Sequence, residues 1–100
     1  MKLAIIVTTD RHLDQIRGIT RAALRKGHTV GIFATDEGVK LLANHEFSSL
    51  SALPGVAMSF CDHSARLYGG RPDGLPTVIS QGGQFDNAVM TSESDKVIML

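Results

Sequence analysis

The chain has 100 residues, and its 10 lysines and arginines balance 10 aspartates and glutamates, so the formal net charge is zero. This length fits one domain spanning residues 1–100, and the lack of a basic excess argues against a nucleic-acid partner. Hydrophobic residues make up 43% of the chain and charged residues 20%, which is the balance of a globular protein and not of a disordered one.

A run of five apolar residues, 3–7, opens the chain. It is too short for the core of a signal peptide and far too short to cross a bilayer, so we expect a cytoplasmic protein with no membrane partner. Cys61 is the only cysteine, which excludes an intrachain disulfide and a cysteine cluster for zinc. No two histidines have the His-x-x-x-His spacing, so we expect neither a metal site nor a cofactor.

Apolar runs and helical spacings alternate along the chain. The apolar runs predict strands over residues 3–7, 28–34, 56–60, 77–80 and 96–100. The helical spacings predict helices over 13–26, after the acidic pair 36–37, over 62–68 and around 85–92. We expect Asp10 to cap the first helix, and Phe85, Ala88 and Val89 to line the buried face of the last one.

Strands that alternate with helices indicate a parallel sheet joined by right-handed crossovers. The predicted fold class is therefore α/β: a flavodoxin-like three-layer sandwich with a mostly parallel sheet of about five strands. The strand order that we expect is 2-1-3-4-5, as in other small folds of this class.

Ligands of such a sheet bind beyond the carboxyl ends of the strands, where the strand order reverses. In the expected order this point lies between the first and third strands. Cys61 would then lie near Thr8 and Thr9, and the end of the second strand would bring Asp36 close. We take Cys61 as the candidate catalytic residue, with candidate binding residues Thr8, Thr9, Asp36, His63 and Arg66.

Cys61 also directly precedes a predicted helix, whose free N–H groups would stabilise a thiolate. His63 and Arg66 would add positive charge, whereas the carboxylate of Asp62 would act against the thiolate. A small buried residue that ends a strand is the alternative interpretation of Cys61, because free cysteines are often buried for packing alone.

Motifs for several other chemistries are missing from the chain. No Gly-x-Gly-x-x-Gly follows the first strand, and no Gly-x-x-x-x-Gly-Lys-[Ser/Thr] is present, which argues against dinucleotide and P-loop nucleotide binding. Cys61 and Arg66 are one residue too close for a phosphatase loop. A single cysteine also excludes dithiol redox cycling within the chain.

Residues 55–69, GVAMSFCDHSARLYG, resemble the active-thiol segment of the DsrE/DsrF-like sulfur-relay family, in which glycine and an apolar strand precede Cys-x-x-Ser. Nearly the whole chain shares the resemblance, which extends to residues 2–9, 27–30, 36–39, 82–85 and 94–98. It implies a small α/β sandwich that assembles into trimers or hexamers. It also implies that Cys61 accepts sulfur as a persulfide and passes it to a thiol of a partner protein.

Two hypotheses follow. In the first, the protein is a sulfur relay in which Cys61 carries a persulfide between donor and acceptor thiols. In the second, it is a non-catalytic oligomeric module that binds a small ligand or anion at the strand ends, and Cys61 is structural. Both predict a homo-oligomer, with Leu67 and Tyr68 beside Gly69 and Gly70 as a half-exposed apolar edge.

Overall fold

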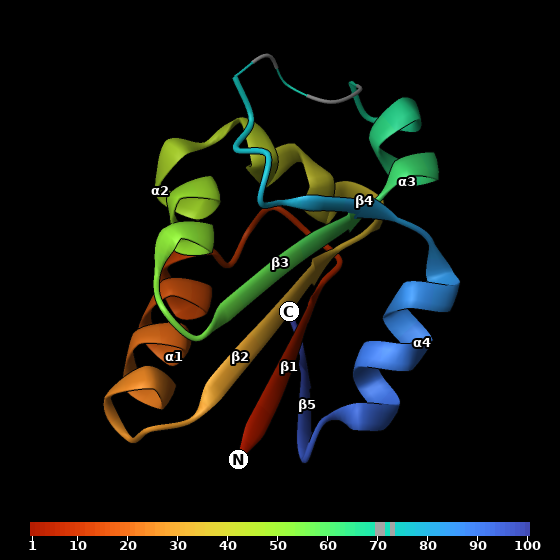
Figure 1. Cartoon of the computed structure of the whole chain (residues 1–100). Coiled ribbons are helices and arrows are strands. Elements are labelled where there is room, and N and C mark those ends of the chain that lie inside the picture. The colour runs from red at the N-terminus through yellow and green to blue at the C-terminus, as the bar shows by residue number, and fades with distance from the viewer. Residues whose placement is uncertain (70–71, 73) are drawn as a thin grey trace.

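A parallel five-stranded sheet forms the centre of the computed structural model, which describes residues 1–69, 72 and 74–100. Every strand pairs in parallel with its neighbours, in the order β4-β3-β2-β1-β5 (Figure 1). The strands are β1 (Lys2–Val7), β2 (Thr29–Ala34), β3 (Val56–Cys61), β4 (Ser80–Gly82) and β5 (Lys96–Met99). The α/β fold class and the parallel sheet are thereby confirmed.

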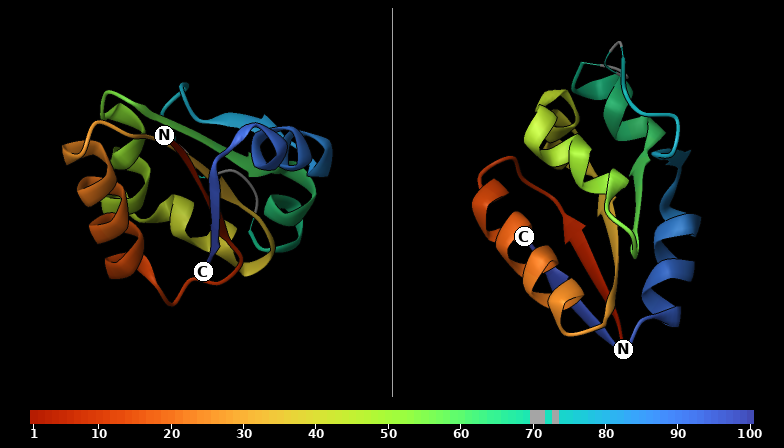
Figure 2. Two further views of the ribbon diagram at one scale, coloured as in Figure 1. Left: turned by 90° about the horizontal axis from the view of Figure 1, so that it is seen from below. Right: turned by 60° about the vertical axis from the view of Figure 1, so that its left-hand side comes forward.

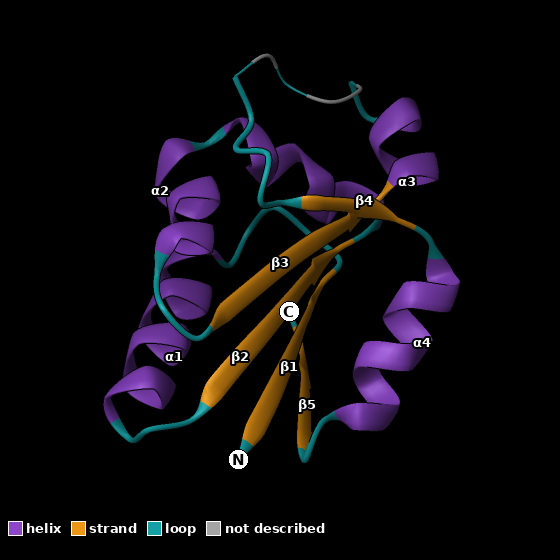
Figure 3. Ribbon diagram, viewed as in Figure 1, coloured by secondary structure: helices purple, strands orange, loops and turns teal. Residues whose placement is uncertain are grey.

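Helices cover the two faces of this sheet unequally. One face packs against α1 (Leu13–Arg25) and a run of short helices, and the other carries a single long helix, α4 (Gln84–Glu93) (Figure 2). The short helices are the 3₁₀ helix η1 (Asp36–Ala43), α2 (His45–Ser48) and the 3₁₀ helix η2 (Ser49–Ala52). A further short helix, α3 (Asp62–Leu67), follows β3 directly at the carboxyl edge (Figure 3).

The core divides accordingly into a large and a small cluster. The large cluster lies between the sheet and α1, η1 and α2, and includes Ile5, Ile16 and Phe47, all fully buried. The small cluster lies under α4 and consists of Ile6, Phe33 and Cys61, with the partly buried Met90 packed on it. Cys61 therefore belongs to the face that α4 alone covers.

The expected strand order 2-1-3-4-5 is wrong. β2 lies between β1 and β3, and β5 takes the other edge of β1. β2 is thus a central strand, which agrees with the complete burial of Val30 to Ala34. The consequence is that the carboxyl ends of β1 and β3 are not adjacent.

Three local expectations are corrected as well. The fourth strand covers 80–82 instead of 77–80, because the Ile79 N–H closes a turn onto the carbonyl of Pro76 (3.1 Å). His12, not Asp10, precedes the first turn of α1, and no side chain caps it. In α4 no residue is fully buried, and Phe85 is 74% exposed, because the helix contacts the sheet mainly through Met90.

Two glycines allow close approaches between elements of the fold. A Cβ on Gly31 of β2 would come within 2.9 Å of the Met90 sulfur, so a bare backbone lets α4 lie close to the sheet. A Cβ on Gly38 would overlap the backbone carbonyl of Val7, so only glycine fits where η1 crosses the end of β1. Gly38 thus fixes the turn that follows β2.

Candidate functional site around Cys61

Cys61 is the last residue of β3 and the residue immediately before α3. Its side chain points to the α4 face together with Ile6 and Phe33, and the residue is 5% exposed. Gly82 of β4 pairs with it in the sheet. The thiol is therefore held at the carboxyl edge of the sheet, among apolar side chains.

Hydrogen bonds at this position favour the thiolate. Burial is the largest single influence and raises the pKa of Cys61, because it penalises the charged form. Hydrogen bonds from the backbone and the hydroxyl of Ser64, the backbone N–H of His63 and the side chain of Gln84 together outweigh it. The net effect is a pKa of Cys61 below that of an ordinary cysteine.

The donors to Cys61 belong to a small network of buried hydroxyl groups. Ser64 and Thr35 are 5% and 6% exposed, and their hydroxyl oxygens lie 3.3 Å apart. The backbone N–H of Asp36 donates to the Ser64 oxygen (2.9 Å), and the Gln84 amide donates to the Thr35 oxygen (3.1 Å). The network links the end of β2, the first turn of α3 and the first residue of α4.

Asp36 takes part through its backbone, which has an unusual conformation. Its φ of 50° is the only positive φ of a non-glycine residue in the part of the chain that the structure describes. The left-handed region disfavours side chains, although aspartate tolerates it better than most residues. This conformation directs the Asp36 N–H toward Ser64.

The predicted binding residues divide into two groups. His63 and Asp36 lie at the site, each through its backbone N–H, while their side chains are exposed. Thr8 and Thr9 are not brought to Cys61, because β2 separates β1 from β3. The Thr8 N–H instead donates to the Leu100 carbonyl (2.7 Å) beyond β5.

Arg66 lies near the site without reaching the thiol. Its guanidinium pairs with the carboxylate of Asp62, one helical turn earlier in α3. The Arg66 side chain is 76% exposed. Since Arg66 pairs with Asp62, it counters the carboxylate that the sequence indicated as unfavourable for a thiolate.

Ser64, Thr35 and Gln84 were not among the predicted site residues. The Cys-x-x-Ser spacing indicated Ser64, because residues three positions apart lie on the same face of a helix. Gln84 and Thr35 are 49 residues apart, and only the topology of the sheet brings them together.

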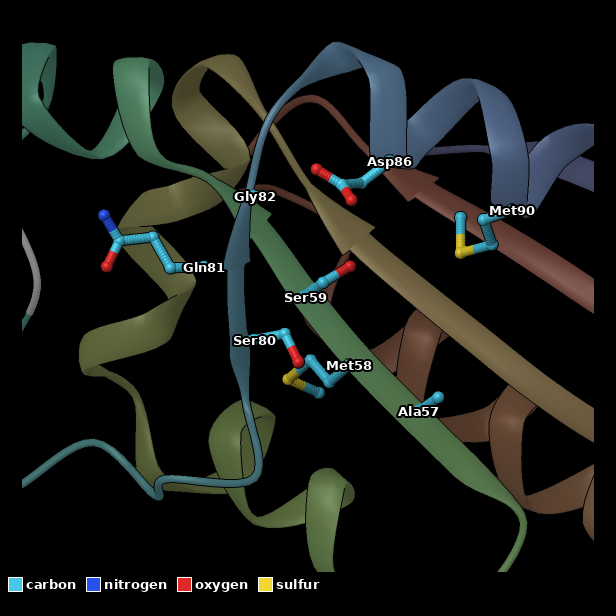
Figure 4. A pocket seen from close by; sticks show the side chains of 8 residues that line it. All are labelled: Ala57, Met58, Ser59, Ser80, Gln81, Gly82, Asp86 and Met90. Carbon is cyan, nitrogen blue, oxygen red and sulfur yellow. The ribbon is translucent and has the colours of Figure 1, made fainter.

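A groove runs along the sheet face beside the site. It has a volume of about 240 Å³, and its lining includes Ala57 and Ser59 of β3, Ser80 of β4, and Asp86 and Met90 of α4 (Figure 4). Ala57 and Ser59 point to the same face of β3 as Cys61, because alternate residues of a strand share a face. The groove therefore leads along β3 toward the cysteine.

Among the described residues, no group of three or more His, Cys, Asp or Glu is placed to hold a metal ion. No helix in the described part of the chain is long and apolar enough to span a membrane.

The fold and the site together define a small α/β protein with a buried, hydrogen-bonded thiol at the carboxyl edge of a parallel sheet. No protein-family model matches the chain, and no curated protein matches it. Solved structures do share its fold. MTH1491 of Methanobacterium thermoautotrophicum, described as a protein of unknown function, superposes with a TM-score of 0.80 at 16% identity, covering 99% of this chain and 98% of that one.

The ychN protein of E. coli superposes with a TM-score of 0.70 at 14% identity, and all of both chains is covered. At such identities the similarity shows the fold alone. That fold is the small α/β sandwich that the sequence resemblance implies.

Proposed function

We propose that this protein is a sulfur relay of the DsrE/DsrF-like kind, in which Cys61 carries sulfur as a persulfide. The observation that carries the proposal is the set of hydrogen bonds to Cys61, which lowers the pKa of the thiol despite its burial. A thiolate is the form that attacks sulfur. The sequence resemblance over residues 55–69 supports the same assignment.

The reaction has two steps of the same type. The Cys61 thiolate attacks the outer sulfur of a donor persulfide, the donor S–S bond breaks, and the donor leaves as a thiolate. An acceptor thiolate then attacks the outer sulfur on Cys61 and releases the Cys61 thiolate. Each step breaks one S–S bond and forms another, so no oxidant, metal or organic cofactor is consumed.

The burial of Cys61 favours a second candidate function. A residue that is 5% exposed and packed with Ile6 and Phe33 fits a structural role. In that case the protein is a non-catalytic oligomeric module that binds a small ligand or anion at the strand ends. The two candidates differ in whether the thiol can be reached from solution.

Persulfide uptake separates them. The protein is incubated with a low-molecular-weight persulfide, and its intact mass is measured beside that of Cys61→Ser. A gain of about 32 Da, one sulfur atom, on the wild type alone supports the relay. An unchanged mass under conditions that persulfidate a control carrier thiol favours the structural role of Cys61.

Self-association and protein partners belong to this proposal. A relay with one cysteine must pass its sulfur to another thiol, so the partners are proteins with donor and acceptor thiols. Several large apolar side chains are exposed, which is typical of surfaces that contact protein: Leu67, Tyr68, Val78, Phe85, Val89, Val97 and Met99. We propose a homotrimer or hexamer located in the cytoplasm.

A further inference from the structure

Either hydroxyl of the Thr35–Ser64 pair can donate the hydrogen bond that joins the two oxygens. Two amide groups favour one of these directions. The Gln84 side chain donates from Nε2 to the Thr35 oxygen (3.1 Å), and its Oε1 accepts from Nδ2 of Asn87 (3.3 Å). The Asn87 contact fixes which end of the Gln84 amide faces Thr35.

One direction of the remaining hydrogen bonds gives each hydroxyl proton of the network an acceptor. Thr35 accepts from Gln84, so its own proton is free to go to Ser64. The Ser64 oxygen then accepts from Thr35 and from the Asp36 N–H (2.9 Å), which uses both of its lone pairs. The single proton of Ser64 is then left for Cys61, whose pKa the Ser64 hydroxyl lowers.

We propose that Gln84 is a positioning residue for Cys61: by donating to Thr35 from the start of α4, it orients the Thr35–Ser64 pair so that the Ser64 hydroxyl donates to the cysteine sulfur. The Gln84 side chain also lowers the pKa of Cys61 itself. This role deepens the proposed sulfur relay, on which its functional meaning rests. The orientation itself exists whether or not sulfur is transferred.

The test measures the rate at which iodoacetamide alkylates Cys61 across a range of pH. Gln84→Met keeps the length of the side chain and removes its donors, and we expect it to move the midpoint of the rate profile upward by about one pH unit, since a hydrogen bond to a charged group is worth roughly that much. Gln15→Met, an exposed change on α1, is the matched control and leaves the midpoint in place.

A second pair of variants asks whether Gln84 acts through Thr35. Thr35→Val removes the hydroxyl at nearly constant shape, and we expect Gln84→Met to shift the midpoint less in this background than in the wild type. Thr35→Ser keeps the hydroxyl and restores the wild-type profile. An equal Gln84→Met shift in both backgrounds, or no shift in either, would overturn the inference.

The substitutions are neutral, so the charges around Cys61 stay as they are. The charged and titratable residues on the elements packed around it are Asp36, Glu37 and Lys40 in η1, Asp62, His63 and Arg66 in α3, and Asp86 and Glu93 in α4. Circular dichroism of each variant shows whether it is folded, and the comparison of Gln84→Met with Gln15→Met tests the role of Gln84 even where Thr35→Val does not fold. Alkylation uses no sulfur donor, so failed persulfide uptake contradicts the relay alone, and an unmoved profile contradicts the role of Gln84 alone.

Discussion

Ser64 provides two of the four hydrogen bonds that lower the pKa of Cys61, one from its backbone and one from its hydroxyl. Ser64→Ala removes the second and leaves the backbone in place. We expect the pKa of Cys61 to rise by about one unit, measured as the pH midpoint of thiol alkylation. Ser51→Ala, which removes a hydroxyl bonded only to a nearby carbonyl, is the control, and an unchanged midpoint in Ser64→Ala would contradict the assignment.

The lowered pKa of Cys61 also predicts how stability depends on pH. A thiol whose folded pKa is depressed stabilises the protein fully above its unfolded pKa of about 8.5. That contribution is lost as the pH falls through the folded pKa. Urea unfolding should therefore show the wild type gaining stability over Cys61→Ser as the pH rises toward about 8.5. A difference that is constant with pH would mean that folding does not change the pKa of the thiol.

Gly38 shows how a position far from the thiol shapes the site. Gly38→Ala would place a Cβ against the carbonyl of Val7 and disturb the turn that directs Asp36 to Ser64. We expect a loss of about 3 kcal/mol in the free energy of unfolding. Gly18→Ala on α1, where nothing lies within 4 Å of the new Cβ, should instead gain about 1 kcal/mol. Equal effects of the two changes would contradict the close approach.

At the scale of single elements, α4 is held less firmly than the central strands. None of its residues is fully buried, and its ion pair from Glu93 to Lys2 joins two exposed side chains, which contributes little. Amide hydrogen exchange should therefore be faster in α4 than in β1 and β2. Equal protection of α4, β1 and β2 would show that the amides of α4 exchange only when the whole domain unfolds. Gln84 would then be a fixed part of the site.

Apolar runs were sufficient to predict β1, β2, β3 and β5, because each of these strands has a continuous hydrophobic signal. They placed the fourth strand too early, over 77–80, since residues 80–82 are polar or small and pair with β3 without an apolar signal. The strand order could not be predicted from the sequence either, because the same apolar run is compatible with several positions in a sheet. Cys61 was found from its place after a strand, whereas Gln84 required the fold.

At the scale of the whole molecule, the exposed apolar side chains predict self-association. Phe85 on α4 is 74% exposed, and Met99 on β5 is 68% exposed. Met99 pairs with Ile6, so it points to the face that carries α4. Light scattering should give three or six times the 10.7 kDa of one chain, and a monomeric mass at moderate concentration would contradict the proposal.

A single substitution tests the surface involved. Phe85→Lys places a charge on the exposed side of α4 without removing a core contact, and we expect it to lower the assembled mass. Gln15→Lys on the exposed surface of α1 adds the same charge elsewhere and should leave the mass unchanged. An assembly that survives Phe85→Lys would indicate a surface away from α4, such as the one that carries Leu67 and Tyr68.

The relay itself is tested most directly by following one sulfur atom on and off Cys61. The wild type is loaded with a persulfide donor, freed of the donor, and mixed with an acceptor thiol while its intact mass is recorded. We predict a gain of about 32 Da on Cys61 that disappears when the acceptor is added and appears on the acceptor as a persulfide. A protein that never gains this mass, or keeps it in the presence of the acceptor, would contradict the account.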